Sequence, residues 1–81
     1  MNVLQGSVVK STAGHDKNAY FVAVSIQGNF VFIADGKERK LEKPKRKNIK
    51  HLDMTKSVIE LHEITNKKLR KLLNEFATVC E

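Results

Sequence analysis

The 81-residue sequence has little of several features that define particular classes of protein. Its single cysteine, Cys80, excludes an internal disulfide and fits a reducing compartment. No apolar run approaches the roughly 18 residues that a membrane-spanning helix needs. Residues 1–6 lack the cationic and apolar regions of a secretion signal. We therefore expect a cytoplasmic protein that does not associate with a membrane.

The sequence also lacks the residue patterns of catalytic and metal sites. The three histidines, His15, His51 and His62, are not grouped with cysteines or carboxylates at metal-ligand spacing. No Ser/His/Asp order and no phosphate-cradling glycine loop can be defended. Cys80 is expected to be a small core residue or to lie at a fraying helix end rather than to act as a nucleophile. We expect no enzyme, no cofactor and no metal.

What the sequence does have is a concentrated positive charge. Residues 37–50 contain eight lysines and arginines against Glu38 and Glu42, so they carry the whole net charge of +6. A solvated charged face is one explanation, but such a face normally mixes both signs, and we favour binding of a polyanion. If four of these cations contact phosphates of single-stranded RNA, log K should fall with log salt at a slope of roughly −3.

Short segments rich in β-branched and aromatic residues or bounded by turn signals predict five strands. Their expected ranges are 6–10, 18–26, 30–34, 38–41 and 47–52. Gly28-Asn29 and Asp35-Gly36 predict tight turns, and Pro44 should end the fourth strand because proline has no amide donor. Five short strands joined by turns predict a mostly β fold, a small barrel that hides its edges by closing on itself. Along the second strand, alternation places Val22, Val24 and Ile26 on one face and Phe21, Ala23 and Ser25 on the other.

The C-terminal third changes to a helical period. Leucines and other apolar residues recur at helical spacing between residues 66 and 79, and Thr65 is a suitable N-cap. We expect the apolar stripe of this helix to pack on the barrel. Residues 54–64 fit either a short helix, which we slightly favour, or an extended connector. The division is thus residues 1–55 as the barrel and 56–81 as connector and helix, in one domain that we expect to be monomeric.

The loop between the first two strands offers a second possible contact with a ligand. Backbone donors near Gly14 and the Lys17 ammonium could hold a phosphate, His15 could stack or donate, and Lys10 would lie beside them. A turn shaped only by glycine and asparagine explains the loop equally well. Phe30 and Phe32 could also stack on bases, but in so small a chain we favour a core position for both.

Two segments together resemble a known family. Gly6, Val8, Gly14, Lys17 and the run 20–24 resemble a KOW motif, although Asn18 stands where that motif usually has a second glycine. The segments 31–36, Arg39-Lys40 and 46–53 with Thr55 are similar to small bacterial KOW-domain RNA-binding proteins. They also resemble the KOW domain of the fourteenth large-subunit ribosomal protein of archaea and eukaryotes. Asparagine tolerates the left-handed backbone conformation, so the loop should keep its shape.

The resemblance implies an SH3-like barrel that binds RNA. Combined with the charge, it predicts a non-enzymatic, ribosome-associated protein that binds ribosomal RNA through phosphate contacts. The expected RNA-binding residues are Lys10, Gly14, His15, Lys17, Lys37, Arg39, Lys40, Lys45, Arg46, Lys47 and Lys50. The helix cations could extend this footprint or form a solvated face. The alternative is an SH3-like module that docks proteins of transcription or translation complexes.

Overall fold

The first three strands form an antiparallel meander, as the sequence predicts. The computed structural model describes residues 5–79 and contains β1 (Ser7–Ser11), β2 (Tyr20–Gln27) and β3 (Phe30–Ala34). The two-residue turn predicted between β2 and β3 is confirmed, since Gln27 pairs with Phe30 on either side of it. The bounds of these strands differ from the predicted ones by no more than two residues.

The last two strands differ from the two that the sequence predicts. The predicted strand over 38–41 is wrong, because these residues form a loop, and the segment predicted as a strand over 47–52 is divided between three elements. These are β4 (Lys45–Asn48), the 3-10 helix η1 (Ile49–His51) and β5 (Leu52–Val58). The helix that we favoured within residues 54–64 is also wrong, because β5 continues to Val58. Apolar and polar residues alternate at the start of β5, and Thr55 donates its hydroxyl to the Val8 carbonyl at 2.7 Å.

The loop replaces the predicted fourth strand because Asp35 binds the local backbone. Its carboxylate accepts hydrogen bonds from the backbone N–H groups of Lys37 and Arg39, both at 2.9 Å. The Arg39 carbonyl in turn accepts from the N–H groups of Asp35 and Gly36. These bonds use the groups that a sheet ladder would need, which is how aspartate competes with regular structure.

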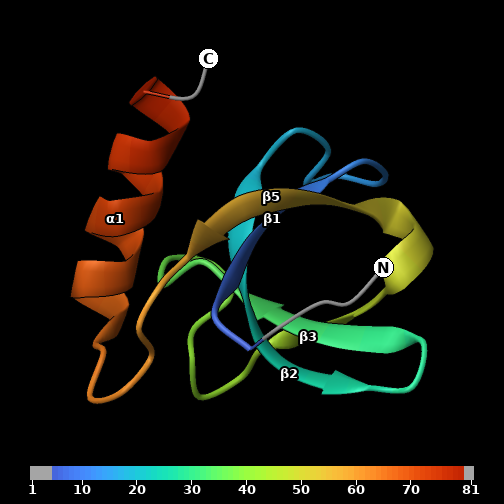
Figure 1. The fold of residues 1–81 in the computed structure, drawn as a ribbon, viewed down its shortest axis with the longest axis horizontal. Coiled ribbons are helices and arrows are strands. Elements are labelled where there is room, and N and C mark those ends of the chain that lie inside the picture. The colour runs from blue at the N-terminus through green and yellow to red at the C-terminus, as the bar shows by residue number, and fades with distance from the viewer. Residues whose placement is uncertain (1–4, 80–81) are drawn as a thin grey trace.

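All five strands belong to one antiparallel sheet in the order β4-β3-β2-β1-β5. The two strands at the ends of this order follow each other in the sequence, so the sheet curls round and η1 connects its two end strands (Figure 1). The Thr12 N–H bonds to the His51 carbonyl at 2.9 Å, and the Ile49 N–H bonds to the Asn29 carbonyl at 2.9 Å. These bonds attach η1 to the loop after β1 and to the turn between β2 and β3. The predicted fold class, mostly β with a small barrel-like sheet of five antiparallel strands and a C-terminal helix, is confirmed.

The inside of the barrel is a small apolar core. It is made of buried side chains from β1, β2, β3 and β5, with partly buried ones from β2, β5, η1 and the loop before β2 packed against them. The buried members are Val9, Phe21, Ala23, Val31, Ile33 and Leu52. This core joins strands that are distant in sequence, so it holds the barrel closed.

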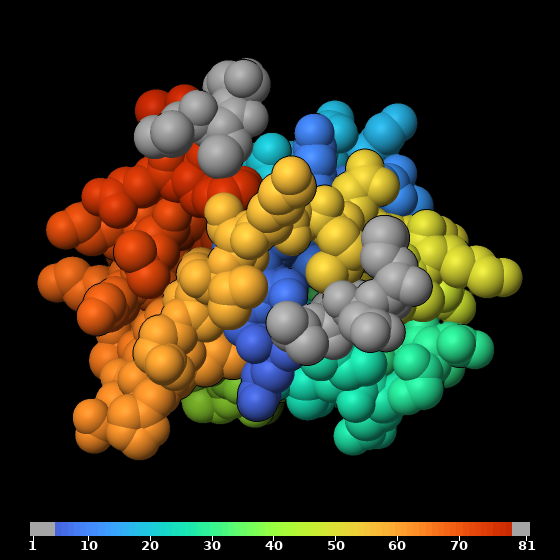
Figure 2. Space-filling view, in the orientation of Figure 1, coloured from blue at the N-terminus to red at the C-terminus, as the bar shows by residue number. Residues whose placement is uncertain are grey.

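A second apolar cluster lies between the outside of the sheet and the helix α1 (Asn66–Val79), as expected. Its buried members are Val8, Val22, Ala34, Leu69 and Leu73. Tyr20 and Phe76 meet edge to face at the rim of this cluster, with ring centroids 5.1 Å apart. The predicted bounds of the helix are confirmed, and the Thr65 hydroxyl accepts from the Lys68 N–H at 3.1 Å, as an N-cap does. The helix stands beside the barrel (Figure 1), on one side of the molecule (Figure 2).

A β-bulge in β2 changes which of its residues face the inner core and which face the helix. Ala23 pairs with Ile33 but Ser25 pairs with Phe32, so Val24 has no partner of its own in β3. The extra residue reverses the alternation of the strand. Ile26 therefore packs against the inner core instead of sharing a face with Val24, which corrects the predicted alternation.

Candidate nucleic-acid interface

The loop between β1 and β2 is a compact turn held by its own backbone. The Asn18 N–H bonds to the Ser11 carbonyl at 2.7 Å, and the Lys17 N–H bonds to the Gly14 carbonyl at 3.2 Å. Asn18 has a φ of 73°, in the left-handed region, so the backbone conformation expected for this position is confirmed. His15 and Lys17 are exposed on this loop.

Asp16 fastens the same loop to β4. Its carboxylate lies 3.3 Å from the Lys47 ammonium and 3.5 Å from that of Lys45, and Lys47 also donates to the Ala13 carbonyl at 2.9 Å. Partial burial acts to raise the pKa of Asp16. The hydrogen bond from its own backbone N–H and the two ammonium groups outweigh that effect, so the pKa is lowered from its ordinary value. Asp16 therefore stays ionised and neutralises part of the nearby positive charge.

Lys47 is used inside the protein rather than on its surface. It pairs across the sheet with the fully buried Val31, and only 8% of its surface is exposed. A lysine in this position has its ammonium group satisfied by Ala13 and Asp16. Lys47 therefore has a structural task, and Lys45 shares its ion pair with Asp16.

The basic loop, residues 35–44, presents its cations outward. Lys37, Arg39, Lys40 and Lys43 are all exposed, while Asp35 holds the backbone from within. Because the backbone of the loop is fixed by hydrogen bonds, its four cationic side chains project from a defined surface and not from a loose tail.

The start of α1 holds this loop in place. The Asn66 side-chain oxygen accepts from the Leu41 N–H at 2.8 Å, and its amide group donates to the Glu42 carboxylate. The bond from Asn66 lowers the pKa of Glu42. At Gly36 a Cβ would clash with the Asn66 carbonyl oxygen, so the loop approaches the helix more closely than another residue would permit. Sequence analysis missed this role of Asn66, which no local pattern indicates.

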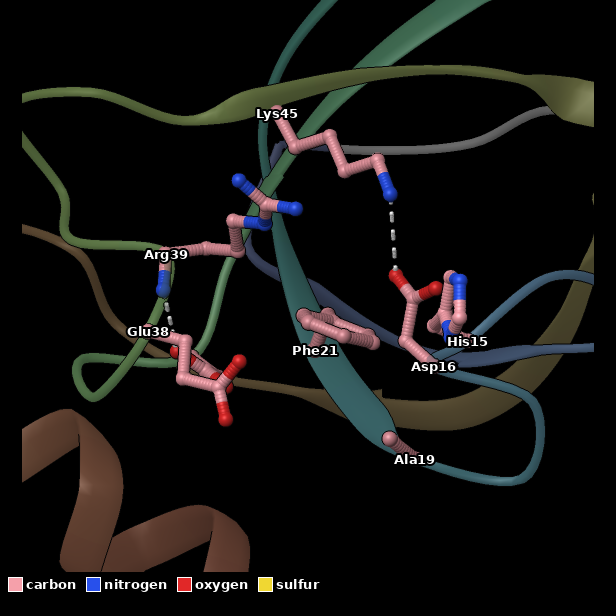
Figure 3. Close-up of a pocket in the computed structure, with 8 residues that line it drawn as sticks. His15, Asp16, Ala19, Phe21, Glu38, Arg39 and Lys45 are labelled. Atoms are coloured by element: carbon pink, nitrogen blue, oxygen red, sulfur yellow. Dashed lines mark hydrogen bonds and ion pairs between the residues drawn. The ribbon is translucent and has the colours of Figure 1, made fainter.

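Three of the expected contact residues meet around a hollow of about 270 Å³. Figure 3 shows Lys45 reaching Asp16 across it, with Arg39 on one side and His15 beside Asp16. The Phe21 ring lies between Arg39 and Asp16 in this view. The hollow joins the loop after β1 to the basic loop, which are distant in the sequence.

The remaining expected residues do not join this hollow. Lys10 lies with its ammonium 5.8 Å from the centre of the Tyr20 ring, and Tyr20 packs against the helix. Lys50 is exposed in η1, and Arg46 lies on the outer face of β4, with its guanidinium carbon 4.7 Å from the centre of the Phe30 ring. The interface is therefore a broad basic surface rather than a single pocket.

The core position that we favoured for Phe30 and Phe32 is not observed. Phe30 is 38% exposed, Phe32 is half-buried, and neither is among the described residues of the two apolar clusters. The sequence contains a signal for this outer position, because Phe30 and Phe32 alternate with Val31 and Ile33, which are fully buried on the opposite face.

Within residues 5–79, no three histidine, cysteine or acidic side chains are grouped as metal ligands would be. In the same part of the chain, no helix has the length and apolar character needed to cross a membrane.

Neither a protein-family model nor a curated protein sequence matches the chain.

Proposed function

We propose that this chain is a non-enzymatic RNA-binding protein of the KOW type, which holds structured RNA by its phosphates. The observation that carries the proposal is the distribution of charge. Six of the eight cationic side chains in residues 37–50 are exposed, and this segment contains the entire net charge of +6. Cations gathered in this way repel one another, and a polyanion relieves the repulsion.

Of the four acidic groups near this surface, three have partners within the protein and Glu38 is exposed in the basic loop, so the surface keeps an excess of positive charge. Asp16 pairs with Lys45 and Lys47, the Asp35 carboxylate binds backbone N–H groups, and Glu42 accepts from Asn66. Lysine and arginine at exposed positions recognise the RNA backbone and its shape more than its bases. The resemblance to KOW domains favours ribosomal RNA as the ligand and a ribosome-associated role in the cytoplasm.

Two triple variants test this function. Lys37→Gln, Arg39→Gln and Lys40→Gln together remove three exposed charges from the basic loop. Lys67→Gln, Lys68→Gln and Lys71→Gln remove three exposed charges from α1 and serve as the matched control, with the same net charge. Binding to a structured ribosomal RNA fragment is measured by fluorescence anisotropy over a series of salt concentrations.

The loop variant should bind about tenfold or more weakly, and the slope of log K against log salt should become shallower by about 2. The helix variant should bind more tightly than the loop variant. Equal losses in both variants would show that net charge alone controls binding and would contradict a specific surface.

Ribonuclease treatment of the protein captured from cell extract tests the other class of partner, because a protein partner that stays bound after digestion would favour the protein-docking alternative. Crosslinking followed by sequencing of the attached RNA would identify the ligand.

A further inference from the structure

The outer face of β3 and β4 carries two aromatic rings that lie outside both apolar clusters of the described residues. Phe30 and Phe32 alternate with Val31 and Ile33, whose side chains are fully buried in the barrel, so the two rings lie on the opposite face. Val24 is the last residue of β2 in the apolar cluster beneath α1. The helix and the segment before it lie on one side of the molecule and the β2–β3 turn on the other (Figure 2).

The neighbours of these rings are polar or cationic. Across β3 and β4, Arg46 pairs with Phe32 and Asn48 pairs with Phe30. On the other side, the partners in β2 are Ser25 for Phe32 and Gln27 for Phe30. The platform, defined as Phe30, Phe32 and these four neighbours, thus contains one cation, no carboxylate, and two side-chain amides that can donate and accept hydrogen bonds.

Arg46 already shows how a planar cation lies on this face. Its guanidinium carbon is 4.7 Å from the centre of the Phe30 ring, within the range of a cation–π contact. This contact places the guanidinium over the Phe30 ring, on the outer face that Arg46 shares with the two rings. A base that reaches Phe30 would therefore displace the guanidinium from the ring face or stack on it, and in both cases it meets a positive charge.

Unpaired RNA bases have the chemistry that this face accepts. Bases stack on aromatic side chains irrespective of sequence, and the phosphates between them need a cation. Residues i and i+2 of a strand lie roughly 6.5–7 Å apart on one face, so two consecutive bases of one strand can each reach a ring. A fully paired duplex offers no free base faces along its sides and cannot use the rings.

We propose that Phe30 and Phe32 form a stacking platform for two unpaired RNA bases, with Arg46 placed to contact the phosphate between them. This inference rests on the proposed function, because it assigns unpaired nucleotides to one part of the same interface. It adds a distinction that phosphate binding alone does not make, namely between single-stranded and paired RNA.

The absence of tryptophan from the chain permits a direct test. Phe30→Trp keeps a flat aromatic ring on the platform and introduces the only tryptophan, whose emission is quenched when a base stacks on it. Titration with an unstructured oligouridine should quench the emission, and titration with a fully paired RNA duplex should leave it unchanged. Unchanged emission with oligouridine bound to saturation would overturn the proposal.

Affinities measured by anisotropy provide the second test. Phe30→Ala should weaken binding of oligouridine roughly 5- to 150-fold, which is the usual effect of removing one stacked aromatic, and should leave the salt slope unchanged. Duplex binding should change by less than about twofold. Val58→Ala is the matched control, because Val58 is an apolar side chain that is 60% exposed on β5. Circular dichroism of each variant checks that the fold is retained.

The outcomes separate this proposal from the proposed function. If wild-type protein binds both RNAs with a salt dependence but Phe30→Ala binds oligouridine as tightly, the platform is wrong and phosphate binding stands. Equal weakening for oligouridine and duplex would also overturn the platform. If the wild type binds neither RNA, the proposed function fails and the platform fails with it.

Discussion

Replacing Lys47 by methionine tests whether this lysine is a structural residue or a contact to the ligand. Methionine keeps an unbranched apolar stem of similar length and removes the ammonium group. Lys47 is 8% exposed, and its Nζ lies 2.9 Å from the Ala13 carbonyl oxygen and 3.3 Å from Asp16 Oδ1. The substitution would leave Asp16 with Lys45, at 3.5 Å, as its remaining cationic partner.

The expected loss of stability follows from these contacts. Hydrogen bonds to a charged group contribute about 1.5–3 kcal/mol, but the wild type also bears the cost of burying the ammonium. We therefore expect Lys47→Met to lower the free energy of unfolding by about 1–3 kcal/mol. In a domain of this size, that corresponds to a fall in Tm of roughly 5–20 °C. The exposed Lys50→Met, on the neighbouring η1, should change stability by less than about 0.5 kcal/mol.

The dependence on pH distinguishes the ion pair from simple packing. The pKa of Asp16 is lowered in the folded protein, so its contribution to stability is fully present above the ordinary value of 3.8. This contribution is lost as the pH falls through the lowered pKa, because the protonated carboxyl is neutral and no longer forms an ion pair with the ammonium. The difference in unfolding free energy between wild type and Lys47→Met should therefore be constant near neutrality and should narrow below pH 3.8.

Urea unfolding followed by circular dichroism at several pH values measures these differences. Equal stability of Lys47→Met and Lys50→Met at neutral pH would refute the structural role. A difference that persists unchanged in acid would show that Asp16 is not the partner that matters. Folded Lys47→Met should also keep its affinity for RNA within about twofold, and a larger loss would return Lys47 to the ligand interface.

Three other substitutions test the remaining features of the fold. Gly36→Ala should be more destabilising than Gly28→Ala, by at least about 1 kcal/mol in thermal unfolding, because both have positive φ but only at Gly36 does the new Cβ meet backbone of the helix; equal losses would contradict the close approach. Asn66→Ala removes the acceptor of the Leu41 N–H and should cost about 1–2 kcal/mol, while hydrogen exchange of that amide should accelerate more than that of the sheet amides. Leu69→Ala empties a fully buried position between helix and sheet and should cost about 2–5 kcal/mol in urea unfolding, so that a smaller loss would show that the helix does not depend on this contact.

Local pattern was sufficient where an element depends on its own residues. The helix over Asn66–Val79, its cap at Thr65 and the turn between β2 and β3 follow from periodicity and turn chemistry over a few positions. The strand predicted over 38–41 failed because a single carboxylate, that of Asp35, binds backbone N–H groups that the pattern assigned to a ladder. The inner position of Ile26 depends on a bulge, and a bulge arises from pairing with another strand.

The sequence by itself determined the mostly β character, the helix and the place of the positive charge along the chain, since all three depend on composition and short-range spacing. The tertiary structure decided which cations reach the surface and which aromatic side chains lie outside the core. Register in β4 turns Lys47 inward to partners more than thirty positions away, Ala13 and Asp16. The same register leaves Phe30 and Arg46 together outside. Neighbours so distant in sequence are set only when the sheet closes, because a shift of one residue would exchange the two faces.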